Sequence, residues 1–328
     1  MRTATCRLPG QPDHACELIA EALVDEYLRR DPASRIRLTV TGGRGLLFVA
    51  GDVLSSADFD VSACVKRAAG SLGVADELEP FISLEPVTPE RVASARLACD
   101  APVTVTGYAT NETPEQLPAT AALARQIAKR LNDKRLRDPD WFWLGPDAEI
   151  TVMADVGRPP YVIIRIEHGN EPLSDVRRRT VSELDPFVGG AKLDINPTGV
   201  CERRGLAAAT GSSDATISPY GSLVPHMPSI AGRDPFSAEK AGTWLARAAA
   251  RKLVKHGARA ALVQASYLPG EMRPAQVRAK DERGRDCASL LGADDLHLER
   301  MKEWLRPGLN FDAAMWGFSG EAGMPWEE

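Results

Sequence analysis

The sequence predicts an α/β protein of the α+β type, built from three similar helix–hairpin–helix units in a pseudo-threefold arrangement. Two observations predict this class. Apolar residues that recur every three or four positions, as in helices, alternate three times with apolar–polar patterns of period two, as in strands. Each pair of strands is flanked by enough helices to cover one face of its sheet. Three sheets should therefore share an interior and leave their other faces exposed.

The first unit begins with an amphipathic helix over residues 14–28, in which Cys16, Ile19 and Leu23 lie on one apolar stripe. Alternating residues over 35–53 predict a hairpin, and Gly42 and Gly43 are the predicted turn because glycine adopts turn conformations readily. A second helix is expected over residues 59–73. The unit therefore has the order helix, hairpin, helix.

The same order recurs twice, with negligible sequence identity between the units. The second unit has helical patterns at 120–136 and 173–187 and a hairpin at 149–169 that turns at 157–160. The third has a helix at 236–257, a hairpin at 259–281 and a helix at 294–305. These patterns divide the chain into predicted domains at residues 1–98, 107–203 and 204–328.

Two long connections separate the units, at residues 83–118 and 193–235, and both are rich in Gly, Pro, Ser and Thr. Loops of this length inside a compact protein are more often functional than idle. The functional residues are therefore expected in or beside these segments.

Composition excludes several classes of protein. The chain has 328 residues, a net charge of −5 and scattered arginines, so no basic surface indicates nucleic-acid binding. No stretch has the apolar length of a membrane span, and the start "MRTATCRLPG" lacks the apolar core of a signal peptide. We therefore expect a cytoplasmic protein that binds neither nucleic acid nor membrane. The six cysteines form no Cys-x-x-Cys pair, which argues against disulfides and zinc.

Five short motifs, in this order, carry a resemblance to a known family. They are "GQPDH" (10–14), "GYATNET" (107–113), "INPTG" (195–199), "GRDP" (232–235) and "GFSGEAGMPWEE" (317–328). On these motifs the chain resembles the S-adenosylmethionine synthetases, or methionine adenosyltransferases, nearly from end to end. "GYATNET" stands as the family has it, and the others are close variants.

The resemblance implies an enzyme whose active sites lie between two subunits of a homodimer, which can pair again into a dimer of dimers. Its substrates would be ATP and methionine or a related amino acid. The sulfur attacks the ribose 5′ carbon and expels triphosphate, and Mg²⁺ is the implied cofactor because a polyanionic leaving group needs cations.

The implied site residues are those that match the family's positions. Catalytic roles fall to Gln11, His14 and Arg233; substrate contacts to Asp52, Tyr108, Asn111 and Asp147; nucleotide contacts to Asp13, Thr198, Tyr220, His226, Arg233, Asp234 and Lys240; and metal binding to Asp13 and Glu239.

Asp13 and Glu239 also have a simpler interpretation. Asp13 is expected directly before the first helix and Glu239 in the first turn of the helix at 236–257, where acids commonly cap a helix or complement its dipole. Composition alone favours that interpretation. The resemblance favours magnesium, since one or two carboxylates plus phosphate oxygens make a sufficient Mg²⁺ site.

Several departures from the family fall on its chemistry. Gln11 stands for a His, His14 for a Lys, Thr39 for an acid near the monovalent cation, and Glu149 for a Lys. Two basic residues are lost before Tyr220, and the gating loop is replaced by "LACDAPVTVT". The leading hypothesis is therefore a diverged adenosyltransferase. The alternatives are a different ATP-dependent reaction on an amino acid, and a catalytically silent homologue that binds a ligand or a partner synthetase.

Overall fold

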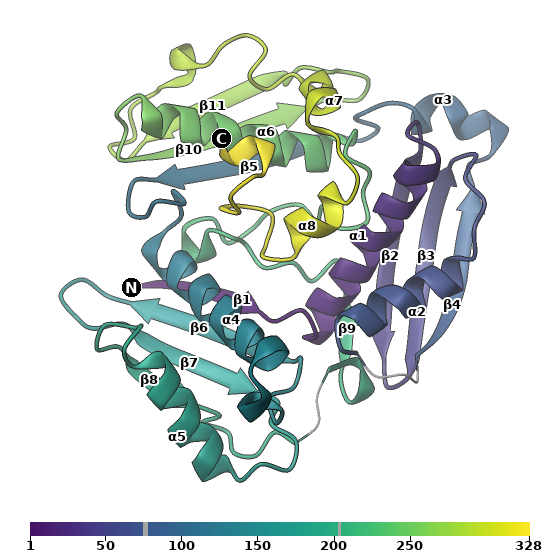
Figure 1. The fold of residues 1–328 in the computed structure, drawn as a ribbon. Coiled ribbons are helices and arrows are strands. Elements are labelled where there is room, and N and C mark those ends of the chain that lie inside the picture. The colour runs from purple at the N-terminus through teal and green to yellow at the C-terminus, as the bar shows by residue number, and fades with distance from the viewer. Residues whose placement is uncertain (75–77, 203–204) are drawn as a thin grey trace.

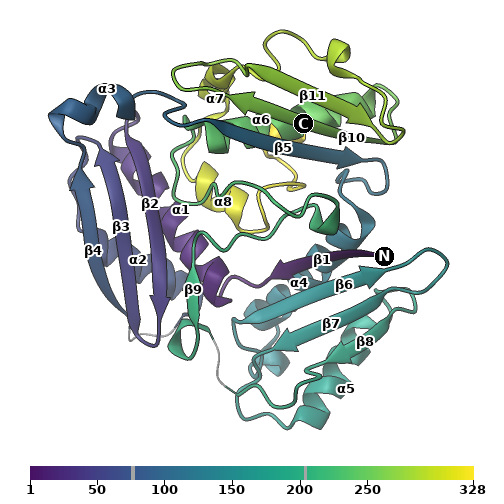
Figure 2. The same ribbon diagram turned by 180° about the vertical axis from the view of Figure 1, so that it is seen from behind.

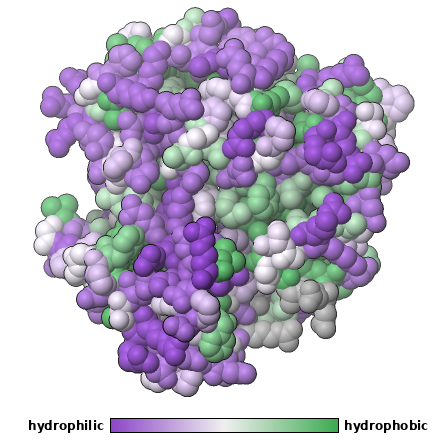
Figure 3. All heavy atoms as spheres, in the orientation of Figure 1, coloured by the Kyte–Doolittle hydropathy of each residue, from purple (hydrophilic) through white to green (hydrophobic). Residues whose placement is uncertain are grey.

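The computed structural model describes residues 1–74, 78–202 and 205–328. Three sheets lie on one side of the molecule (Figure 2), and the long helices cover them from the other side (Figure 1). The α/β class predicted from the sequence is confirmed. The helix side of the surface is mostly hydrophilic, with apolar atoms gathered near its centre (Figure 3). None of the helices among the described residues has the length and apolar character of a membrane span.

The N-terminal unit contains helix α1 (Pro12–Arg30), strands β2 (Arg35–Gly43) and β3 (Leu46–Leu54), helix α2 (Val61–Ser71) and strand β4 (Glu79–Pro86). Its sheet has the order β4-β3-β2-β9, where β9 is Thr210–Ser212. Strands β2 and β3 form the predicted hairpin, and β3 pairs with β4 in parallel. Asp60 caps α2 by accepting a hydrogen bond from the Ala63 amide at 2.8 Å.

The turn of this hairpin was predicted two residues too early. It is formed by Arg44 and Gly45, which both have positive φ (54° and 89°), as a type I′ hairpin requires. Gly42 and Gly43 lie inside β2. A Cβ on Gly42 would meet the Leu46 carbonyl oxygen at 2.2 Å, and one on Gly43 would meet that of Ala209 at 2.0 Å. These two glycines allow the neighbouring backbone to come close to β2, and they do not form the turn.

The central unit contains strand β1 (Arg2–Arg7), helix α4 (Ala119–Arg137), strands β6 (Ala148–Ala154) and β7 (Tyr161–Ile166), helix α5 (Leu173–Leu184) and strand β8 (Lys192–Ile195). Its sheet has the order β1-β6-β7-β8, and the β6–β7 hairpin is the one that the sequence predicts. A separate apolar core of this unit lies between the sheet and helices α4 and α5.

The C-terminal unit contains strand β5 (Val103–Thr110), helix α6 (Ala238–Lys255) and strands β10 (Ala260–Tyr267) and β11 (Gln276–Asp281). Its sheet has the order β11-β10-β5. Gly107 lets α6 approach β5 closely, since a Cβ there would lie 2.1 Å from the Ala246 carbonyl carbon. One large apolar core joins this unit to the N-terminal unit.

The last predicted helix, at residues 294–305, is present only in its second half. The structure has a single 3₁₀ turn at Leu298–Arg300, helix α7 (Met301–Trp304) and then helix α8 (Leu309–Ala314). Leu305 is already extended, and Pro307 disfavours the helical conformation in the residue before it. A short helix, α3 (Val92–Ala95), preceded by a 3₁₀ turn at Pro89–Arg91, lies in the first long connection.

Each sheet borrows one strand from elsewhere in the chain. Strand β1 belongs to the central sheet, β5 to the C-terminal sheet and β9 to the N-terminal sheet. The predicted domains at 1–98, 107–203 and 204–328 are contiguous stretches and do not describe this exchange. The predicted boundary between residues 203 and 204 lies outside the described residues.

Candidate functional site

The predicted site residues gather in three places. We call them the turn group at the start of α1, the strand group beside β2, and the loop group around the end of β5. The turn group comprises Gln11, Asp13 and His14; the strand group comprises Asp52, Arg233, Asp234 and Glu239; the loop group comprises Tyr108, Asn111 and Tyr220.

The turn group is built on the first turn of α1. Gln11 is the N-cap, and its side-chain oxygen accepts a hydrogen bond from the His14 amide at 3.0 Å. Asp13 therefore lies inside the first turn rather than directly before the helix. One of its carboxylate oxygens accepts from the Ser212 amide at 3.1 Å, and the other lies 3.0 Å from the Arg7 guanidinium. The helix dipole and Arg7 both favour negative charge at this point.

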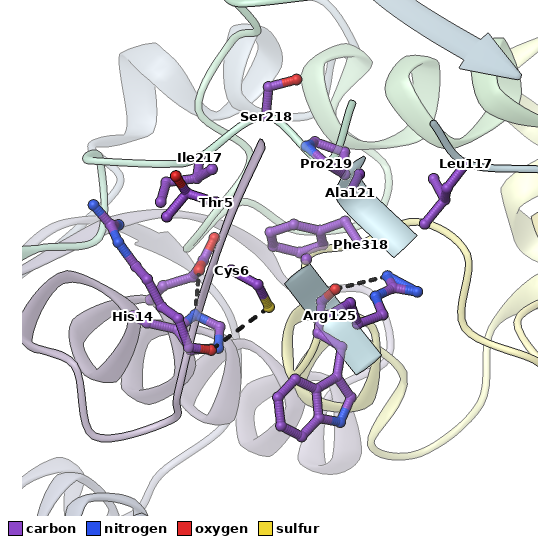
Figure 4. Close-up of a pocket in the computed structure, with 14 residues that line it drawn as sticks. Thr5, Cys6, His14, Leu117, Ala121, Arg125, Ile217, Ser218, Pro219 and Phe318 are labelled. Carbon is purple, nitrogen blue, oxygen red and sulfur yellow. Dashed lines mark hydrogen bonds and ion pairs between the residues drawn. The ribbon is translucent and has the colours of Figure 1, made fainter. Parts of the chain in front are cut away.

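His14 is buried and turned into the molecule. Its Nδ1 lies 2.7 Å from the Glu17 carboxylate, and its Nε2 lies 3.2 Å from the Met315 carbonyl oxygen. It lines a small pocket, and Figure 4 shows His14 and Arg125 on opposite sides of that pocket with the Phe318 ring between them. The pocket volume of about 60 Å³ holds a few water molecules but not a nucleotide.

The strand group surrounds Arg37, a residue that the sequence did not single out. The Arg37 Nη2 donates to Glu239 Oε1 at 2.8 Å and to Asp100 Oδ1 at 3.1 Å. Asp52 pairs with Arg37 across the β2–β3 hairpin, and its carboxylate lies 3.2 Å from the Arg91 guanidinium. Arginines and acids thus alternate around one pocket at this end of the N-terminal sheet.

Arg233 lies beside Arg37 and is partly buried. Its Nη1 donates to the Leu38 carbonyl at 3.3 Å, while its buried Nε has no hydrogen-bond partner among the described residues. Burial lowers the pKa of Arg233, and the charge of Arg37 acts in the same direction. Two neighbouring guanidinium groups at a partly desolvated position favour the binding of an anion.

The carboxylate of Asp234 is bound to backbone amides and holds the local chain in place. Its carboxylate accepts hydrogen bonds from the amides of Ile36, at 2.8 Å, and Phe236, at 2.9 Å. Burial raises the pKa of this carboxyl. Asp234 fixes the chain that presents Arg233, and its role in nucleotide binding stays a prediction.

The turn and strand groups are connected along the edge of β2. Strand β9 pairs with the end of β2 at Thr41–Gly43, and its residue Ser212 contacts Asp13. Arg233 pairs with Arg37 by an isolated β-bridge farther along β2. Thr41 and Arg37 are four residues apart on β2, so the two groups are separated by about 13 Å along the strand. Between them, Thr39 donates a hydrogen bond to Asp214 at 3.1 Å, so an acid lies beside the position where the family acid is missing.

In the loop group, Tyr108 belongs to β5, Asn111 directly follows this strand, and Tyr220 is buried beside Tyr108. The rings of Tyr108 and Tyr220 meet edge to face with centroids 5.9 Å apart. Tyr108 and Asn111 line a surface hollow of about 380 Å³ together with Arg259 and Lys280. This hollow has the size of a small-molecule site.

The other predicted residues do not join these groups. Thr198 and His226 are exposed, and buried Asp147 accepts a hydrogen bond from the Gly205 amide at 2.9 Å. Lys240 is fully buried, and its ammonium lies 2.6 Å from Glu21 and 3.1 Å from the Asn310 side chain. A nucleotide contact by Lys240 would need this buried pair to open. The roles of these four residues stay predictions.

Mg²⁺ is the cofactor that the resemblance implies, and the chemistry of its two acids fits it. Asp13 and Glu239 supply hard carboxylate oxygens in the first turns of α1 and α6. Each is already neutralised by an arginine, Arg7 or Arg37, so a divalent ion would have to displace a guanidinium. Among the described residues, no three His, Cys, Asp or Glu side chains gather into a ready-made metal cluster. The acids therefore fit a metal that arrives with phosphate.

Comparisons with known proteins identify the family of this chain. The S-adenosylmethionine synthetase N-terminal domain matches residues 2–87, and the central domain of the same family matches residues 98–199. S-adenosylmethionine synthases of Thermus thermophilus and Deinococcus radiodurans are each 26% identical over 97% of this chain and 93% of their own. The fold is similar to that of an unusual S-adenosylmethionine synthetase from Campylobacter jejuni, with a TM-score of 0.86 and 20% identity over 99% of this chain and 96% of that one. The chain belongs to the S-adenosylmethionine synthetase family.

Proposed function

We propose that this protein is a diverged adenosyltransferase that joins the adenosyl group of ATP to the sulfur of methionine or a methionine-like amino acid. The observation that carries this proposal is the strand group. There Arg37 and Arg233 lie side by side next to Glu239, at a pocket that also contains Asp52. Two guanidinium groups suit the triphosphate, and an acid suits the amino group of an amino acid.

The reaction needs charge control at its leaving group. A sulfur lone pair forms the new bond to the ribose 5′ carbon while the carbon–oxygen bond breaks and its electron pair leaves with triphosphate. Arg233 would bind the phosphate oxygens and stabilise the charge that grows on them. Gln11 would donate a neutral hydrogen bond to the leaving oxygen, which is weaker than a bond from a charged donor.

Bound Mg²⁺ ions would supply further positive charge to the triphosphate, and Asp13 and Glu239 are the residues that would each hold one. Arg7 and Arg37 compete for the same carboxylates. The protein should therefore depend less on magnesium than it would if these two acids had no arginine beside them.

We further propose a homodimer that forms through the open faces of the sheets. Leu46 and Phe48 on β3 and Phe81 on β4 are about half exposed, at 45%, 48% and 50%, and the Phe48 and Phe81 rings stack with centroids 5.3 Å apart. An apolar group of this kind on a sheet face is typical of a subunit interface. Pairing there would bring the strand group close to a second subunit.

The test is to incubate the purified protein with ATP, methionine and Mg²⁺ and to identify nucleoside and phosphate products by mass spectrometry. We expect slow formation of S-adenosylmethionine. Faster conversion of another amino acid would support the different ATP-dependent reaction, and ligand binding without any product would support the silent homologue.

Calorimetry with a non-hydrolysable ATP analogue tests the metal assignment. Asp13→Asn should reduce the gain in affinity that Mg²⁺ provides, because a neutral amide is a poor ligand for a hard cation. Asp133→Asn, at an exposed position on α4, is the matched control and should behave as wild type. Equal binding with and without Mg²⁺ in the wild type would return Asp13 to the role of a first-turn acid.

A further inference from the structure

A buried carboxylate near the end of the described chain, that of Glu327, is surrounded by donors. Its Oε1 accepts hydrogen bonds from Arg247 Nε at 2.9 Å and from the Gly320 amide at 2.7 Å. Its Oε2 accepts from Arg247 Nη2 at 2.8 Å and from Arg251 Nη1 at 3.0 Å. The contact with Arg247 is bidentate, which fixes the plane of the guanidinium. Glu327 therefore determines how Arg247 is oriented.

Arg247 is fully buried and uses its remaining donors on backbone carbonyls in β5 and in the loop that follows it. Its Nη1 donates to the carbonyls of Tyr108, at 2.6 Å, and Gln116, at 3.0 Å. Its Nη2 donates to the Glu115 carbonyl at 2.7 Å. These carbonyls lie at the two ends of the segment 109–116, so one guanidinium holds both ends together. We call this segment the closed loop.

The closed loop contains the side chains that the substrate would meet. Asn111 lies within it and Tyr108 at its start, and both line the hollow of the loop group. The Thr110 amide also donates to the Gln116 carbonyl at 3.1 Å, and Gln116 has a φ of 56°, which a non-glycine residue rarely adopts. A strained residue at the closure indicates that the surrounding contacts determine the shape of the loop.

The position of Glu327 is itself fixed by packing. The preceding residue, Trp326, stacks on Trp244 of α6 with ring centroids 4.1 Å apart and an interplanar angle of 8°. Its indole nitrogen donates to the Phe318 carbonyl at 2.9 Å. The segment that carries Glu327 is thus attached to the same helix as Arg247.

We propose that Glu327 is a positioning residue, which sets the conformation of the loop 109–116 through Arg247 and thereby the affinity for the amino-acid substrate. The part that concerns substrate affinity rests on the proposed function. A merely structural role would predict a general loss of stability, whereas this role predicts a change confined to the loop and to one substrate.

The experiment compares Glu327→Gln, Glu327→Asp and Arg247→Lys with the wild-type protein. Glu321→Gln is the matched control, because Glu321 lies in the same segment but pairs with Lys129 at 2.6 Å. Two readouts are used. They are initial rates against amino acid and against ATP, and amide hydrogen exchange of residues 110–117 relative to β10.

For Glu327→Gln we expect the KM for the amino acid to rise at least tenfold, with kcat changed less than threefold and the KM for ATP less than twofold. Exchange of the loop amides should quicken at least tenfold while that of β10 is unchanged. Glu327→Asp, which keeps the charge, should recover part of both effects. Arg247→Lys should reproduce the effect of Glu327→Gln, because one ammonium cannot make the same set of bonds.

The inference is overturned if the amino-acid KM stays within twofold of wild type, or if exchange quickens in β10 as much as in the loop. Absence of adenosyl product from the wild-type protein would overturn the proposed function instead. The exchange of the loop amides then decides by itself whether Glu327 positions the loop.

Discussion

The guanidinium of Arg37 lies 2.8 Å from the carboxylate of Glu239, although the two residues are 202 positions apart in the chain. The Arg37 side chain is 42% exposed and that of Glu239 is 16% exposed, so the pair lies at the border between protein and solvent. Pairs of this kind contribute about 0.2–1 kcal/mol. Such a contact is weak enough for a ligand to break and strong enough to alter its binding.

Arg37→Ala should make the site more dependent on metal. Without the guanidinium, Glu239 is free for Mg²⁺, while tripolyphosphate loses one cationic partner. We expect tripolyphosphate to bind several-fold more weakly in EDTA, and Mg²⁺ to restore more affinity than it adds in the wild type. Calorimetry measures both, with Arg273→Ala as the control at an exposed pair on another surface. An equal effect of Mg²⁺ in wild type and variant would contradict the competition.

Gln11→His should raise turnover with ATP and methionine. A protonated imidazole stabilises the charge on the leaving oxygen better than an amide does, and a tenfold gain corresponds to about 1.4 kcal/mol. The variant also loses the cap on the His14 amide, which should lower the free energy of unfolding by about 1 kcal/mol. Steady-state rates and urea unfolding measure the two effects.

The neutral control for this change is Gln11→Asn, which keeps an amide that can cap the helix and should give no gain in rate. Adding His14→Lys would extend the test only partly, because the side chain at position 14 is directed toward Glu17. Lack of any gain in Gln11→His, or better turnover of another amino acid, would mean that the turn serves a different substrate.

Phe48→Asp should convert the proposed dimer into a monomer. A carboxylate in the middle of a stacked apolar pair would have to lose its hydration on association, and a buried unpaired charge is strongly unfavourable. Sedimentation at micromolar concentration gives the mass of each form. Leu136→Asp, at a 60% exposed leucine on α4, should remain dimeric. A monomeric wild-type protein would refute the interface.

The stability of the fold should depend on pH through Glu21. Burial raises the pKa of this carboxyl from 4.5 to about 7, against the opposing effect of the Lys240 ammonium. Between these values the folded chain keeps a proton that the unfolded chain releases. The contribution of Glu21 to the free energy of unfolding is therefore complete below pH 4.5 and falls as the pH rises toward 7.

The double variant Glu21→Gln/Lys240→Met should flatten the dependence of unfolding free energy on pH between 4.5 and 7. Replacing both members of a buried pair avoids leaving one charge alone. Urea unfolding across this range provides the measurement. Glu26→Gln is the control. The hydrogen bond to Arg29 lowers the pKa of Glu26 to about 2, so this carboxyl group titrates outside the window. An unchanged slope in the double variant would show that other groups control the dependence.

The parts of the fold that the sequence predicted are those held together by local pattern. The three hairpins and the long helices α1, α4 and α6 carry their apolar residues at the period of a strand or a helix, so periodicity reveals them whatever they pack against. Strands β1, β5 and β9 were missed because their partners are remote. Arg2 pairs with Ala154, and Thr110 with Ala260. Pairing over such distances leaves no periodic signal beyond the strand itself.

The grouping of the candidate site residues was predictable only in part. The motifs "GQPDH" and "GRDP" singled out Asp13 and Arg233, and the family resemblance singled out Glu239 in the first turn of its helix. Arg37 was missed because an arginine at an alternate position of a half-exposed strand has the pattern of an ordinary solvated charge. Only the fold brings Glu239 and Asp100 to it. Contacts between side chains that are far apart in the chain cannot be predicted from one sequence alone.

The exchange of strands among the sheets also bears on how this protein can fold and be divided. No sheet is complete until segments from distant parts of the chain have met, so the fold has a high contact order and its nucleus must close large loops early. The three units are interlocked rather than strung together. A fragment that ends at any one unit would leave an unpaired strand edge open to association. Unfolding should accordingly proceed as one cooperative event across all three units.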